Sequence, residues 1–141
     1  MAHQRALVFD FGTRKIGIAA ANRLAGTATP LKTLAAADGV PEWREIAGLV
    51  REWQPEVLVV GIPTNTDDTE SAMSDRARVF AGLLRAQTGL PTEEIDERFT
   101  SSEAEDVLRN QRRSGQRTRR VRPEDIDLMA ARLMAETWVR T

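Results

Sequence analysis

The chain has 141 residues and a net charge of −1, with 41% hydrophobic and 29% charged residues. This length fits one domain, residues 1–141, and the composition excludes a disordered or fibrous chain. Cysteine is absent and His3 is the only histidine, which excludes disulfides and catalysis through a Ser-His-Asp or Cys-His pair. No apolar run approaches the roughly 18 residues of a membrane span, so we expect a cytoplasmic protein that does not bind membranes.

The first third of the sequence predicts three strands in succession. The apolar run over 6–12 ends at glycine, residues 15–22 follow after a tight turn, and a third strand is expected at 26–34. Because the links between these strands are short, we expect an antiparallel meander.

Helices and strands alternate over the rest of the chain. Strands are expected at 57–63, which is apolar on both faces as in a helix-covered strand, and within 91–99. This order predicts an α/β domain whose mixed five-stranded sheet is flanked by helices. Helical spacing of apolar residues predicts helices over 42–54, 73–89, 102–110 and 123–139.

Apolar spacing also predicts which side chains of the helices point inward. The tryptophans Trp43, Trp53 and Trp138 stand at helical core positions, which favours packing over base stacking. For the last helix, the residues expected to face inward are Ile126, Met129, Ala130, Leu133 and Thr137.

A first carboxylate, Asp10, stands inside a strand that should be buried. Strand alternation places it on the face of Ala6 and Val8, opposite Phe9 and Phe11. An unpaired carboxylate on a buried face costs several kcal/mol or becomes protonated. The structural alternatives are a buried salt bridge and a turn cap before the following glycine.

Further carboxylates stand near the ends of later elements. Glu97 lies at the end of a predicted strand, where an exposed edge with an ion pair to Arg98 is the structural alternative. Asp125 and Asp127 stand in the first turn of the last helix, where the helix dipole already favours acids.

Three carboxylates from two strands and a helix start have the composition of a hard-cation site. Mg²⁺ and Mn²⁺ prefer oxygen ligands, and paired metal ions activate water in phosphodiester cleavage without a histidine base. Spacing alone is weak support, because only the fold can bring Asp10, Glu97 and Asp127 together.

Basic residues gather in one stretch of an otherwise acidic chain. Residues 109–122 contain seven arginines and no acid, so this stretch carries +7 and the remainder carries −8. Such a cluster favours docking of a phosphate backbone, although a solvated loop is the structural alternative.

Four segments, in order and over nearly the whole chain, resemble the motifs of the YqgF/RuvX family. The opening motif is similar to residues 10–19, Asp-Phe-Gly-Thr-Arg-Lys-Ile-Gly-Ile-Ala, and the central strand to 59–63, followed by Asn65. Residues 96–101, Asp-Glu-Arg-Phe-Thr-Ser, resemble the family's Asp-Glu-Arg-x-Thr element, and residues 126–131 resemble its final Asp-x-x-Ala-Ala helix.

The resemblance implies a ribonuclease-H-like fold similar to that of the resolvase RuvC. It implies a metal-dependent endonuclease that matures the 5′ end of pre-16S rRNA. It further implies that Asp10, Glu97 and Asp127 form a metal-binding catalytic triad for Mg²⁺ or Mn²⁺. In this setting the residues expected to contact nucleic acid are Arg14, Arg98, Arg112, Arg113, Arg117, Arg119, Arg120 and Arg122.

Other functions remain open at the level of sequence. The same chemistry fits a Holliday-junction resolvase acting on four-way DNA, for which a homodimer rather than a monomer is expected. A non-catalytic ribosome-assembly factor that binds RNA is a third possibility. Asp125 is an additional candidate ligand. A sugar-kinase or actin-like ATPase function is disfavoured, because those proteins need two such domains.

Overall fold

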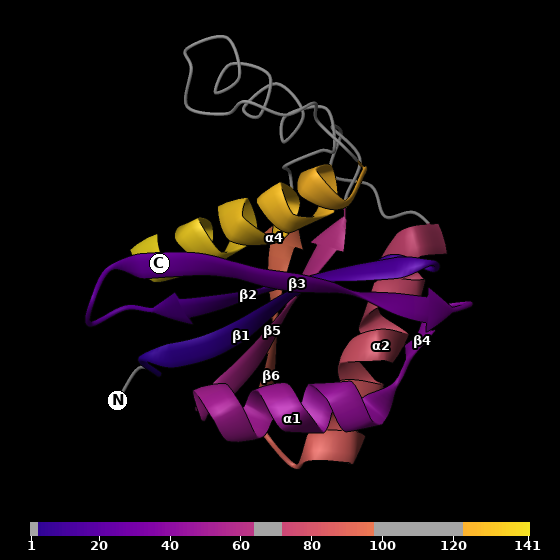
Figure 1. Cartoon of the computed structure of the whole chain (residues 1–141), viewed down its shortest axis with the longest axis horizontal. Helices are drawn as coiled ribbons and strands as arrows, with labels where there is room; N and C mark the ends of the chain where they lie inside the picture. Colours follow the sequence, from indigo (N-terminus) through magenta and orange to yellow (C-terminus); the bar gives the residue numbers. More distant parts are fainter. Residues whose placement is uncertain (1–2, 64–71, 98–122) are drawn as a thin grey trace, which may run out of the picture.

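The computed structural model describes residues 3–63, 72–97 and 123–141, which form one mixed sheet with helices on both faces (Figure 1). The predicted helix over 102–110 lies outside the described residues. The strands are β1 Arg5–Asp10, β2 Lys15–Asn22, β3 Thr27–Ala37, β4 Val40–Pro41, β5 Val57–Pro63 and β6 Thr92–Glu97. The described helices are α1 Trp43–Trp53, α2 Ala72–Thr88 and α4 Pro123–Arg140.

The sheet confirms the predicted α/β architecture with one additional strand. Its order is β4-β3-β2-β1-β5-β6. The first three strands form the expected antiparallel meander, whereas β5 runs parallel to β1 and β6 runs parallel to β5. The prediction of five strands missed β4, a two-residue strand that pairs with the end of β3 after a turn at Asp38 and Gly39, whose φ angles are 51° and 85°.

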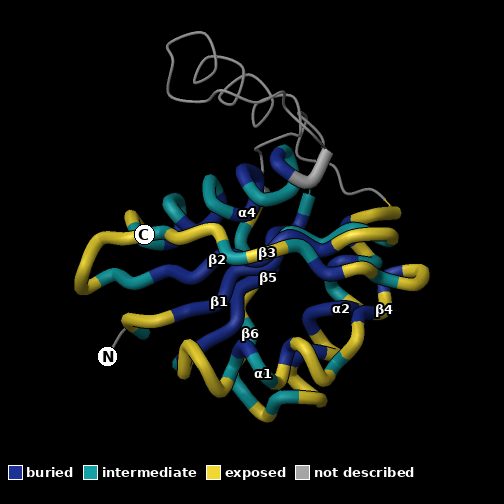
Figure 2. Tube along the Cα trace, viewed as in Figure 1, coloured by how far each residue is buried: buried dark blue, intermediate teal, exposed yellow. Residues whose placement is uncertain are grey.

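Side-chain alternation divides the sheet into two apolar clusters, one on each face. Helix α4 covers one face, and α1 and α2 lie on the other (Figure 1). Strand β5 contributes to both clusters and is buried from Val57 to Ile62, as expected for a strand covered by helices (Figure 2). No helix in the described part of the chain is both long and apolar enough to cross a membrane.

The face that α4 turns toward the sheet differs from the prediction. The expected inward residues Met129 and Ala130 are buried, but they form a small cluster of their own with Ile126 and Leu133. Two of the four residues on the contact face are alanines, which add little to an apolar pattern. The α4 residues that pack against the sheet are Ala131, Met134, Ala135 and Trp138.

The three tryptophans divide between core and surface. Trp138 is buried, and Trp43 packs at the edge of the core with its ring stacked on Phe80, at 6.2 Å between ring centroids. The predicted core position of Trp53 is wrong, because its residue surface is 39% exposed. Trp53 is the last residue of α1.

One arginine joins the end of α4 to the beginning of the chain. Arg23 follows β2, and its guanidinium carbon lies 3.7 Å from the centroid of the Trp138 ring. The same guanidinium donates hydrogen bonds to the carbonyls of His3 (2.9 Å) and Trp138 (3.2 Å). These contacts fix the C-terminal end of α4 against the β1–β2 hairpin.

Candidate active site

Asp10 is the last residue of β1 and lies on the α4 side of the sheet. Ala6 and Val8, four and two residues earlier, belong to the cluster under α4, whereas Phe9 belongs to the opposite cluster. The alternation predicted from the sequence is therefore confirmed. The side chain of Asp10 is partly buried at the carboxyl end of its strand.

A glycine brings α4 close enough to reach this strand end. Gly17 of β2 pairs directly with Asp10 in the antiparallel register. A Cβ atom at Gly17 would lie only 2.6 Å from the backbone carbonyl oxygen of Asp127, so the first part of α4 rests directly on this residue. Gly17 is therefore next to Asp10 within the sheet and against the backbone of Asp127 in α4, which brings the two aspartates close together.

Asp10 and Asp127 interact electrostatically, and this interaction affects the pKa of Asp10. Burial is the larger cause and the negative charge of Asp127 the second, and together they raise the pKa of Asp10 from 3.8 to about 7. Both causes disfavour the charged form of the carboxylate. A proton or a cation therefore stabilises this site near neutral pH.

Glu97 ends a strand at the same edge of the sheet. Its backbone pairs with Pro63 of β5, and β5 is parallel to β1, so Asp10 and Glu97 are the last residues of strands that end at one edge of the sheet. Ile95, two residues before Glu97, packs against the cluster under α4. The side chain of Glu97 lies outside the described part of the structure.

The two acids of the first turn of α4 differ in burial. Asp125 is 7% exposed, whereas Asp127 is only partly buried. The helix dipole explains why acids stand in this turn. It does not account for the deep burial of Asp125. Within residues 3–63, 72–97 and 123–141, no three histidine, aspartate or glutamate side chains gather into a group that could hold a metal ion.

Of the arginines expected to contact nucleic acid, the structure describes Arg14. It is exposed in the turn between β1 and β2, close to Asp10 in the chain. The turn is fixed to the end of β3 because the carbonyl of Arg14 accepts a hydrogen bond of 2.8 Å from the amide of Ala36. Those outside the described residues are Arg98, Arg112, Arg113, Arg117, Arg119, Arg120 and Arg122.

Sequence reasoning missed the structural role of Gly17. It noted this glycine as part of a motif only, although a glycine inside a strand is a known sign of close backbone approach. That signal identifies β2 as the strand that another element approaches. It does not identify α4 as that element.

Comparisons with known proteins identify relatives over nearly the whole chain. A family model described as RuvX, Holliday junction resolvase, matches residues 4–141. A protein of Acinetobacter baylyi, named "Putative pre-16S rRNA nuclease", is 42% identical over 99% of this chain and 92% of its own length. A protein of Chromohalobacter salexigens with the same name is 46% identical over 94% of this chain and 86% of its own length.

Solved structures of two resolvases share the fold at low sequence identity. The RuvC protein of T. thermophilus in complex with a Holliday junction substrate superposes with a TM-score of 0.54 at 15% identity, over 98% of this chain and 96% of that chain. A Fowlpox virus resolvase, solved with Holliday junction DNA, gives a TM-score of 0.55 at 10% identity, over 97% of this chain and 99% of its own. This likeness shows a ribonuclease-H-like fold.

Proposed function

We propose, from the premise that this chain belongs to the RuvX family, that it hydrolyses phosphodiester bonds at the 5′ end of pre-16S rRNA. The observation that carries this proposal is the match to relatives named as pre-16S rRNA nucleases over nearly the full length of the chain. The enzyme is a metal-dependent endonuclease acting on RNA in the cytoplasm.

The catalytic residues of this proposal are Asp10, Glu97 and Asp127. Gly17 supports the pairing of the two aspartates, because it contacts the backbone of Asp127 and pairs with Asp10. Support for Glu97 comes from the register, which ends β1 and β6 at the same sheet edge. Ile95, two residues before Glu97, packs against the cluster under α4, and strand alternation predicts the same face for Glu97.

The donor set fits a hard divalent cation. Asp10 and Asp127 offer only oxygen atoms. Burial and the charge of Asp127 raise the pKa of Asp10, and a bound cation would offset both effects. Asp10, Glu97 and Asp127 would hold Mg²⁺ or Mn²⁺, with Asp125 as a further candidate ligand. Such ions supply an activated water and stabilise the leaving oxygen in phosphodiester hydrolysis.

Arginine side chains near the carboxylates would bind and orient the RNA. Arg14 is exposed in the turn that follows Asp10, where its guanidinium is available to a phosphate. The arginines at 98 and within 112–122 would extend this contact along the backbone. If they do, the logarithm of affinity falls with the logarithm of salt concentration at a slope of about −0.7 per phosphate contact.

Cleavage of four-way DNA is the second candidate, favoured by the description of the matching family as Holliday junction resolvase. It uses the same carboxylates but requires two sites, and therefore a homodimer on the junction. A monomer bound to junction DNA contradicts it. A non-catalytic assembly factor would bind RNA without metal-dependent turnover.

A cleavage assay with three variants tests the proposal. The purified protein is given Mn²⁺ or Mg²⁺ with either labelled 5′-precursor rRNA or a four-way DNA junction. We expect Asp10→Asn to lower the cleavage rate by at least about a thousandfold while RNA binding persists. Glu97→Gln should act in the same direction.

The matched control is Glu52→Gln, which removes one exposed negative charge on α1, on the other side of the sheet. It should cleave like the parent protein. Retained cleavage in Asp10→Asn contradicts the assigned site. RNA binding without cleavage in the parent protein supports the assembly factor instead.

A further inference from the structure

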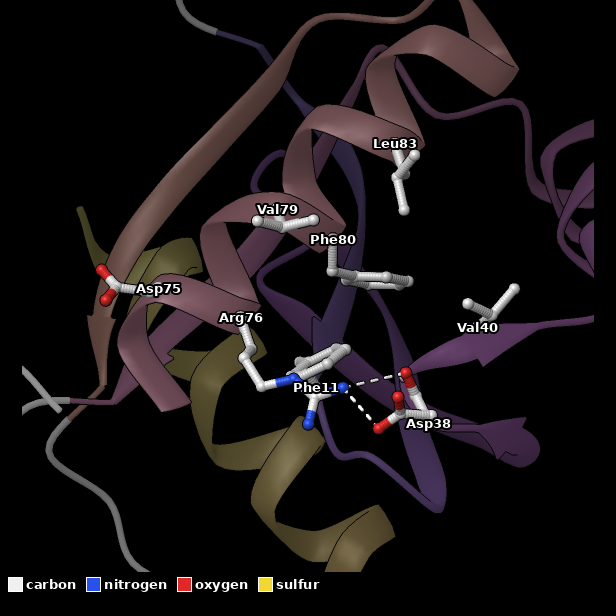
Figure 3. A pocket seen from close by; sticks show the side chains of 9 residues that line it. Phe11, Asp38, Val40, Asp75, Arg76, Val79, Phe80 and Leu83 are labelled. Atoms are coloured by element: carbon white, nitrogen blue, oxygen red, sulfur yellow. Dashed lines mark hydrogen bonds and ion pairs between the residues drawn. The ribbon is translucent and has the colours of Figure 1, made fainter. Parts of the chain in front are cut away.

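A small pocket opens on the face of the sheet opposite Asp10, between α2 and the β3–β4 turn (Figure 3). Its volume is about 210 Å³. Charged side chains stand at its rim, among them Arg76 and Asp38. The apolar residues that line it are Phe11, Val40, Val79, Phe80 and Leu83.

The walls of this pocket are fixed by local contacts. The rings of Phe11 and Phe80 lie 5.1 Å apart between centroids, tilted by 37°. A Cβ atom at Gly39 would lie 2.9 Å from the Phe11 ring, so the turn presses against the ring edge. Arg76 of α2 holds this turn through an ion pair of 2.6 Å and a 3.0 Å hydrogen bond to the carboxylate and carbonyl of Asp38.

The pocket lies close to the candidate active site along the chain. Phe11 follows Asp10 directly, and consecutive Cα atoms are about 3.8 Å apart. Asp10 ends β1 on the α4 side, and Phe11 packs against the cluster on the α2 side. A nucleic-acid strand that crosses this sheet edge at Asp10 therefore passes the mouth of the pocket within a few nucleotides.

The chemistry of the pocket favours a neutral, planar ring. A dry cavity of about 150 Å³ is large enough for benzene, so this volume fits one aromatic ring. Asp38 and Asp75 outnumber Arg76 at the rim, which disfavours a phosphate. The walls are apolar and open to solvent, since Val79 is 64% and Val40 is 48% exposed.

We propose that this pocket takes one unstacked nucleobase of the RNA strand that is bound at Asp10. The base packs on the partly exposed Phe11 ring and against Val79, over the buried Phe80. The guanidinium N–H groups of Arg76 that are not bound to Asp38 donate to its edge. Every base has a π-face, so the pocket selects for an unpaired nucleotide rather than for a sequence. The inference rests on the proposed function and adds that the substrate is single-stranded beside the cleaved bond.

Binding measurements with abasic RNAs test this inference. The Asp10→Asn variant, which does not cleave, is titrated with RNAs spanning the 5′ boundary of 16S rRNA, each lacking a single base. We expect one position near the cleaved bond at which loss of the base weakens binding about tenfold. Exchanging that base for another should change binding much less.

A pocket-filling variant provides the second half of the test. Val79→Phe, added to Asp10→Asn, places a phenyl ring at the pocket mouth from an exposed position. Intact RNA should then bind about tenfold more weakly, and the abasic penalty should disappear. The matched control is Leu24→Phe in the β2–β3 turn, where the residue is 87% exposed, and it should keep the penalty.

The outcomes separate the pocket from the function. Tight RNA binding with a flat abasic profile overturns the pocket assignment and leaves the nuclease proposal intact. If sedimentation shows that the parent protein is a dimer and Val79→Phe a monomer, with the abasic penalty unchanged, the pocket assignment is overturned in favour of contact with a second copy of the chain. No RNA binding by any protein in the series overturns the proposed function and the pocket together.

Discussion

The two faces of the sheet are packed in different ways. Under α4 the cluster includes the small residues Ala19, Ala131 and Ala135, and at Gly17 the backbones of helix and sheet approach closely. On the other face, the contacts between the sheet and α1 and α2 are made by bulky side chains such as Phe9 of β1 and Phe80 of α2. Close backbone approach places the carboxylates of the candidate site, whereas side-chain volume on the other face supplies most of the core.

The largest expected effect on stability lies on the bulky face. Leu84 of α2 is fully buried there, so Leu84→Ala should lower the free energy of unfolding by about 4 kcal/mol. Urea denaturation measures this loss. RNA cleavage well below the unfolding transition should stay near the parent rate, because Leu84 lies on the side away from α4. A folded but inactive variant contradicts this separation of the two faces.

The next effect is the pH dependence of the α4 face. Because the pKa of Asp10 is raised from 3.8 to about 7, the folded state binds this proton more tightly than the unfolded state. Its contribution to stability is complete below about pH 4 and is lost as the pH rises through about 7. Without divalent metal, we expect this loss to be on the order of 3 kcal/mol.

Asp10→Asn removes that titration and serves as the comparison. Its unfolding free energy, followed by urea denaturation across the same pH window, should not show this decline. Above the window, the variant should therefore be more stable than the parent protein. Parallel pH profiles for the two proteins contradict the assigned environment of Asp10.

A smaller effect on stability is expected when α4 is pushed away from the sheet at Gly17. Gly17→Ala sets a methyl group 2.6 Å from the Asp127 carbonyl and should cost about 2 kcal/mol. We also expect the cleavage rate of the folded variant to fall by up to about a hundredfold, since a displacement of a catalytic group by about 1 Å can have that effect. Gly82→Ala on α2 is the matched control, because a Cβ atom there meets nothing within 4 Å.

The smallest effect is expected at the surface of α4. Arg132 and Glu136 form an ion pair of 3.2 Å one helical turn apart, with both side chains partly exposed. Glu136→Gln should lower stability by only about 0.3–0.5 kcal/mol in thermal denaturation, because solvent screens such pairs. A loss of several kcal/mol contradicts this prediction and would mean that the ion pair helps to hold α4 on the sheet.

The sequence was informative where a local pattern determines the structure. Period-two alternation placed Asp10 on the face opposite Phe9, and the apolar run over 57–63 predicted a covered strand, as observed. Short links between three strands predicted the meander. These features depend on residues within one element or on its direct neighbours.

What the sequence could not supply depends on contacts between distant segments. The inward prediction for α4 is confirmed for Met129 and Ala130, which are buried, but it missed the neighbouring face with Ala131 and Ala135 that packs against the sheet. Strand β4 is only two residues long and forms because the Asp38–Gly39 turn returns the chain to β3. The contact between Gly17 and Asp127 required the complete fold, as did the pocket beside Phe11.

The contact between Gly17 and α4 also has a consequence for the order of events on the ribosome. Strands β1 and β2 leave the exit tunnel long before α4, yet Asp10 gains its neighbour Asp127 only when that helix docks. Until then the chain exposes the alanine and valine surface under α4, which a nascent-chain chaperone can hold. Synthesis from the N-terminus thus keeps the carboxylate pair unassembled until the last helix has emerged.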